Sequence, residues 1–129
     1  MKLNPDCVRD VLLEVEERTD FCDRMMYYIE DPKPKRWEKY DHSEIIYHVR
    51  QCEYSGLILG AEYLDGGDCI FIDDLSPSGH KFLANVRQDT IWNHTKEIAG
   101  KIGTKSLDAL LQISTSVITE LIRAQCGII

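Results

Sequence analysis

Two runs of β-forming residues separated by a short turn constrain the fold of this chain more than any other feature. LILGAEYL begins at Leu57 and CIFID ends at Asp73, with Asp-Gly-Gly-Asp between them at 65–68. Glycine and aspartate between two apolar runs are typical of a β-hairpin turn. We therefore expect a hairpin over residues 57–73.

An amphipathic segment, YDHSEIIYHVRQCEYSGLI, occupies residues 40–58. It predicts a helix from about Ser43 to Tyr54, capped by Asp41 or Ser43, in which one apolar stripe faces the core. The stripe consists of Ile45, Ile46, Val49 and Cys52. Gly56 stands where helices commonly end in a left-handed residue, so we expect 57–58 to fold back as hydrophobic closure.

The N-terminal third predicts a helix, a short strand and a loop. Asn4 can cap a helix of about four turns that opens with Pro5. Its spacing buries Cys7, Val8, Val11, Leu12 and Val15 and leaves Arg9, Asp10, Glu14, Glu16, Glu17 and Arg18 mostly to water. The β-formers in 21–30 indicate a short strand, and DPKPK at 31–35 indicates an exposed basic loop.

Three helices are expected after the hairpin. Ser76 caps one that begins at Pro77 and buries Phe82, Leu83 and Val86; the next begins at Asp89 or Thr90 and closes at Gly103; Ser106 caps the last. The last helix is so apolar that it must pack deep in the domain or lie in a dimer interface. We expect a homodimer through this C-terminal helix.

The order helix, short strand, helix, hairpin, helix resembles that of winged-helix proteins, in which the hairpin is the wing. The expected fold class is α+β, with a winged-helix-like domain at 1–88 and a two-helix C-terminal extension at 89–129. More closely, MKLNPDCVRDVLLEVEE, EIIYHVRQCEYSGLI and LSPSGHKFLANVR resemble a family of small bacterial and prophage-encoded proteins catalogued as a domain of unknown function. The resemblance covers nearly the whole chain and implies no activity.

Composition and motifs exclude several classes of function. The formal net charge is −7, and residues 51–75 carry six acidic and no basic side chains, so the overall field does not attract nucleic acid. The five cysteines form no C-x-x-C pair, and the four histidines show no metal-ligand spacing. Nucleophile and phosphate-loop motifs are missing as well. We therefore expect no enzyme activity, cofactor, metal or membrane span, and a cytoplasmic location.

Binding is the class of function that remains, and we consider two hypotheses for the partner. In the first, a dimeric regulator contacts double-stranded DNA; phosphate contacts come from Lys33, Lys35, Arg36, Lys39 and Arg50, and base contacts come from Tyr47, His48 and Gln51. In the second, the chain is a protein-interaction module of phage or prophage origin that docks on a host or phage protein without binding DNA. The shape favours the first hypothesis, whereas the acidic wing and the missing second helix of a helix-turn-helix weaken it and make the second a serious competitor. Trp37 and Tyr40 are expected to pin the basic loop to the core.

Overall fold

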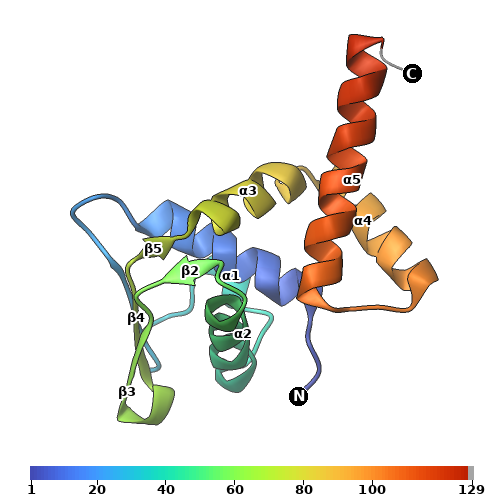
Figure 1. Ribbon diagram of the computed structural model, residues 1–129. Coiled ribbons are helices and arrows are strands. Elements are labelled where there is room, and N and C mark those ends of the chain that lie inside the picture. The colour runs from blue at the N-terminus through green and yellow to red at the C-terminus, as the bar shows by residue number, and fades with distance from the viewer. Residues whose placement is uncertain (128–129) are drawn as a thin grey trace. The chain divides into compact units, whose positions relative to one another are not determined.

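The computed structural model describes residues 1–127, which divide into two compact units, 1–80 and 81–127. Five α-helices and small antiparallel sheets make up the described chain, which confirms the α+β class. Unit 1 contains α1 (Pro5–Arg18), β1 (Met25–Tyr28), the 3₁₀ turn η1 (Lys35–Trp37), α2 (His42–Tyr54), β2 (Ile58–Leu59), β3 (Glu62–Leu64), η2 (Asp65–Gly67), β4 (Cys69–Ile72) and β5 (Asp74–Leu75). Helix α3 (Pro77–Val86) crosses the boundary, and unit 2 continues with α4 (Asp89–Ile102) and α5 (Leu107–Cys126) (Figure 1). Residues 128 and 129 of the predicted 89–129 extension lie outside the described residues.

The helices begin where local side-chain chemistry predicts. The side chains of Asn4, Asp41, Ser76 and Ser106 accept backbone N–H groups of the first turns of α1, α2, α3 and α5. At the end of α2, Gly56 has φ +73°, and the Leu57 amide donates to the Cys52 carbonyl at 2.9 Å. This left-handed closure was predicted, and it turns the chain directly into the hairpin.

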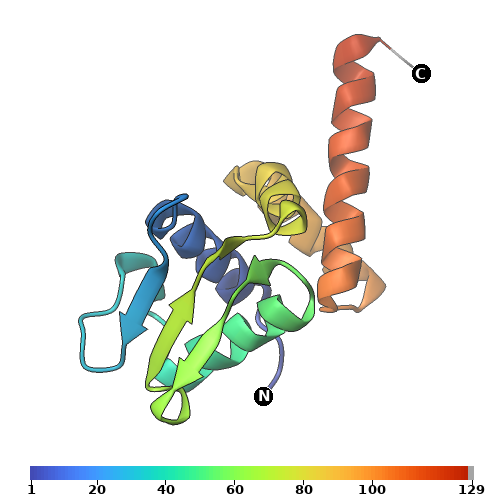
Figure 2. The ribbon, with the colours of Figure 1, turned by 60° about the vertical axis from the view of Figure 1, so that its left-hand side comes forward.

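The predicted hairpin forms, and its arms pair in two separate stretches. β2 pairs with β5 and β3 pairs with β4, and the break between the two pairings falls at Gly60 and Asp73. β1 adds to the far side of β4, which gives a three-stranded sheet in the order β1-β4-β3 (Figure 2). Met25, Tyr27, Ile70 and Ile72 are buried on one face of this sheet. That face packs against η1, where the Tyr27 and Trp37 rings lie edge to face with their centroids 5.2 Å apart.

Unit 2 is helical. α4 and α5 pack together. The rings of Phe82 in α3 and Trp92 in α4 lie edge to face with their centroids 6.2 Å apart. The buried side of α5 consists of Leu107, Leu110, Ser114 and Val117. Its last two turns, from Leu121 to Cys126, are exposed all round. No helix within residues 1–127 is both long and apolar enough to cross a membrane.

Candidate functional site

The basic segment ahead of α2 is fixed to α1 by its two aromatic residues. The Trp37 side chain is completely buried, and its Nε1 donates to the backbone oxygen of Asp10 at 3.1 Å. The Tyr40 hydroxyl donates to Asp10 Oδ2 at 2.6 Å. Burial, together with this bond to a carboxylate, raises the pKa of Tyr40, so the phenol remains a neutral donor. Both residues therefore pin the segment as predicted.

The carboxylates of α1 bind two of the segment's cations. Arg36 Nη1 lies 2.6 Å from Glu14 Oε1 and 2.5 Å from Glu17 Oε2, and Lys39 Nζ lies 3.1 Å from Asp10 Oδ2. Asp10, Glu14 and Glu17 are spaced four and three residues apart, so they form a single stripe on one side of the helix. The expectation that these three acids mostly face water was wrong for two of them, because Asp10 and Glu14 are 9% and 6% exposed.

The two remaining cations of the segment, Lys33 and Lys35, differ in whether they have a bonding partner. Lys33 Nζ donates to the Tyr40 backbone oxygen at 2.6 Å, so it closes the loop on itself. Lys35 is exposed at the start of η1 and makes no contact with a described acidic group. Of the four loop cations predicted to reach phosphate, only Lys35 is therefore without a partner within residues 1–127.

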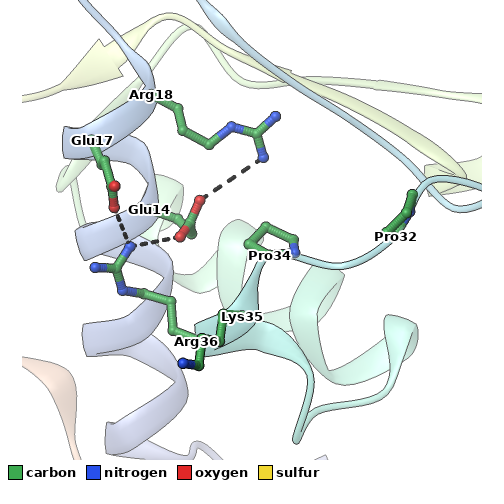
Figure 3. A pocket seen from close by; sticks show the side chains of 7 residues that line it. All are labelled: Glu14, Glu17, Arg18, Pro32, Pro34, Lys35 and Arg36. Carbon is green, nitrogen blue, oxygen red and sulfur yellow. Dashed lines mark hydrogen bonds and ion pairs between the residues drawn. The ribbon is translucent and has the colours of Figure 1, made fainter.

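A groove of about 800 Å³ opens between this segment and α1. Figure 3 shows the Arg36 guanidinium between the carboxylates of Glu14 and Glu17, with Arg18 directed at Glu14 from the opposite side. The remaining lining residues are Pro32, Pro34 and Lys35. Apart from Lys35, the charged groups of the groove are paired with each other, so it offers no uniform charge to an anion or a cation.

On α2, His48 does not occupy the outer face that the sequence predicted. Its side chain is 0% exposed, its Nε2 accepts the Asn4 amide at 2.7 Å, and its Nδ1 lies 2.7 Å from the Glu44 carbonyl. A backbone amide can only donate, so the proton is on Nδ1, which donates to Glu44. A side chain that is buried with both ring nitrogens bonded is unavailable to a base edge, so the assignment of His48 as a DNA contact is corrected. His48 instead joins the cap of α1 to α2.

The remaining α2 candidates lie at or near the surface. Arg50 is exposed and its guanidinium carbon lies 5.7 Å from the centre of the Tyr63 ring. Tyr47 and Gln51 are half-buried. Ile46, predicted to belong to the buried stripe, is also half-buried. It lines a hollow of about 360 Å³ at the start of α2, with Met1, His42, Ser43, Tyr47, Arg50, Gly66 and Asp68.

The structure thus brings Tyr47 and Arg50 together at one hollow, whereas two of the four loop cations, Arg36 and Lys39, are paired with α1. The sequence reasoning missed the acidic stripe of α1 and the short helix η1. The i, i+4, i+7 spacing of Asp10, Glu14 and Glu17 ahead of a basic loop was the available signal for the stripe. Pro34 directly before η1 was a signal for the turn, since its fixed φ suits the start of a helical turn.

Comparison with known proteins gives a family but no activity. A family model described as "Hypothetical protein (DUF2513)" matches residues 2–105. The chain belongs to this family. The predicted membership of a family of unknown function is therefore confirmed. A relative from Haemophilus influenzae, named "Uncharacterized protein", is 28% identical over 124 residues, which are 95% of this chain and 99% of the relative. No solved structure matches.

Proposed function

We propose that this DUF2513 protein is a non-catalytic protein-interaction module, built in unit 1 on a winged-helix-like plan and of phage or prophage origin. The strand order β1-β4-β3, with α2 leading directly into the hairpin, supports the winged-helix-like plan. The buried cysteine of α1 is also unsuited to act as a nucleophile. Burial and then the charges of Glu44 and Asp10 raise the pKa of Cys7 to about 12, so this group is not a thiolate nucleophile near neutral pH.

The observation that carries the proposal is the pairing of the basic segment with α1. Arg36 and Lys39 would have to leave Glu14, Glu17 and Asp10 before they could contact phosphate. The charge balance of unit 1 opposes DNA as well, since residues 1–80 contain nine Lys/Arg and eighteen Asp/Glu in all. Approach of a polyanion to such a surface is repulsive at long range. A protein partner, which can present cations and apolar groups, suits the surface better.

The test of this proposal is a titration of the full chain into labelled random-sequence duplex DNA at about 50 mM salt, where non-specific binding is strongest. We expect no change in fluorescence anisotropy. Binding that Lys35→Ala and Arg50→Ala weaken would favour the DNA-regulator hypothesis instead.

We also propose that α5 mediates a homodimer. Leu121 and Ile122 are 44% and 54% exposed, and Leu121 continues the stripe of Leu107, Leu110, Ser114 and Val117 that is buried in unit 2. Glu120 and Arg123 flank this apolar pair in the sequence, and as an i, i+3 pair they lie on the same side of the helix, where Glu120 Oε1 and Arg123 Nη1 are 3.8 Å apart. An antiparallel second copy would bring Glu120 of one protomer opposite Arg123 of the partner subunit. The helix is thus complementary to itself in both apolarity and charge.

Replacing Leu121 and Ile122 together with glutamate should abolish this dimer, because four carboxylates would meet in an apolar interface. Light scattering after gel filtration should give twice 14.9 kDa for the wild type and 14.9 kDa for the double variant. Ser116→Glu, on an exposed position of the same helix, is the matched control and should leave the dimer intact. A wild-type monomer at micromolar concentration would refute the dimer.

A further inference from the structure

The outward face of the three-stranded sheet in unit 1 is unusually apolar for a solvent-facing surface. It is defined here as the outer sheet face. Its apolar side chains are Met26, Tyr28, Leu64 and Phe71, and the exposed Glu62, which pairs with Phe71 in the ladder, is its acid at one edge. Met26 and Leu64 are 49% and 44% exposed, and Tyr28 and Phe71 are partly exposed. The ladder sets Met26 beside Phe71, and Tyr28 and Leu64 on either side of Cys69. Antiparallel sheets with one solvated face normally carry polar residues there, so this face has the composition of a contact surface.

In the half of the outer sheet face around Phe71, the aromatic ring is covered by the guanidinium of Arg24. The Arg24 guanidinium carbon lies 4.9 Å from the centre of the Phe71 ring. Arg24 Nη2 lies 2.9 Å from Glu62 Oε1, and its Nε lies 3.2 Å from Asp73 Oδ1. An aromatic ring below and two carboxylates at the rim therefore hold this cation, an arrangement in which cation–π attraction and ion pairing act together.

The half of the outer sheet face around Tyr28 also has an aromatic ring and nearby carboxylates, but among the described residues it holds no cation. The Tyr28 ring meets Phe71 edge to face at 6.2 Å, so the two aromatic positions are adjacent. Glu30 and Asp31, both exposed, lie in the turn after β1, separated from Tyr28 by the exposed Ile29. Burial, contact with Cys69 and then the charges of Asp31 and Glu30 raise the pKa of Tyr28, which is consistent with carboxylates near this ring. Within residues 1–127, no cation lies over the Tyr28 ring.

We propose that the outer sheet face docks a segment of a protein partner that carries arginine between apolar side chains, with an arginine over Tyr28 near Glu30 and Asp31. The apolar side chains of the segment cover Met26 and Leu64. Charge complementarity selects this occupant, because the rim is acidic and its own cation, Arg24, is held by Glu62 and Asp73. This inference rests on the proposed protein-interaction function and specifies its surface and partner chemistry.

The probe is a blocked nine-residue peptide in which arginine alternates with leucine, compared with the same peptide carrying citrulline for arginine. It is titrated into the ¹⁵N-labelled full chain, and amide shifts are followed by NMR. We expect the arginine peptide alone to shift the amides of β1, β3 and β4. Tyr28→Leu, and separately Glu30→Gln with Asp31→Asn, should each weaken binding by about three- to tenfold, as expected for loss of a cation–π contact or an ion pair.

Two matched controls separate this site from general attraction to an acidic protein. Tyr54→Leu removes an aromatic ring that is 71% exposed on α2, and Glu38→Gln removes an exposed carboxylate before α2. Both should leave the peptide affinity within about twofold of wild type. Equal weakening by the controls, equal binding of the citrulline peptide, or shifts away from the sheet would overturn the proposal. Concentration-dependent shifts of the same amides without peptide would overturn it too, because a second copy would then occupy the face.

The outcome separates this inference from the proposed function. If the peptide fails to bind the sheet and DNA also fails to bind, the docking surface is wrong and the protein-interaction proposal stands. If duplex DNA binds, the proposed function itself fails.

Discussion

Trp37→Ala should lower the free energy of unfolding by about 3–5 kcal/mol, the range for deleting a large buried aromatic side chain. The indole is completely buried, it meets the Tyr27 ring at 5.2 Å, and it bonds the Asp10 carbonyl. Alanine would leave a cavity between η1, α1 and β1, together with an unpaired carbonyl. Such a loss is a large part of the stability of an ordinary domain, so the variant is expected to be partly unfolded at 37 °C.

Urea denaturation followed by circular dichroism measures this loss. Tyr54→Ala is the control, because it removes an aromatic side chain that is 71% exposed, and it should change stability by no more than about 0.5 kcal/mol. If Trp37→Ala cost less than about 1 kcal/mol, the basic segment would not be anchored to α1, and the account of its charges would lose its structural basis.

Gly79→Ala should destabilise unit 1 even though alanine is the better helix former. A Cβ on Gly79 would lie 2.1 Å from the Leu57 carbonyl oxygen, and this oxygen also accepts the Ser76 amide at 3.0 Å. Because the Leu57 carbonyl and the Gly79 Cα both belong to the backbone, neither can move away from the added methyl group as a flexible side chain could. We expect a loss of about 2–3 kcal/mol, at the upper end for overpacking, against a helix-propensity gain of about 1 kcal/mol.

The matched control for this substitution is Gly100→Ala. Gly100 lies within α4, and a Cβ there meets nothing within 4 Å, so the propensity gain should appear alone as about 0.5–1 kcal/mol of added stability. Thermal unfolding of the two variants should therefore shift in opposite directions. Equal shifts would show that the close approach of α3 to Leu57 does not exist.

The parts of the fold that could be predicted from the sequence depend on neighbouring residues. Asn4, Asp41, Ser76 and Ser106 cap their helices through bonds that span two or three residues. The signals for such caps are therefore contained in a short stretch of chain. The closure at Gly56 is equally local.

The features that were missed depend on contacts between distant segments. Asp10 and Glu14 are buried because residues 36–40 fold over α1, and the spacing of these acids indicates a stripe but not which distant segment covers it. His48 is buried because its imidazole meets the Asn4 amide, 44 residues away. A basic loop and a surface histidine thus suggested a DNA-binding face, whereas the long-range pairs use these groups within the protein.

Unit 1 binds three of its four loop cations, Lys33, Arg36 and Lys39, within the protein, and we therefore expect it to have no affinity for nucleic acid. The most direct measurement is the salt dependence of duplex DNA binding by the full chain, from about 20 to 200 mM salt, where each phosphate contact adds about one unit to the slope of log affinity against log salt. We expect no measurable binding at any salt concentration in this range. Micromolar binding with a slope of about four, lost in Arg36→Ala and Lys39→Ala, would contradict it.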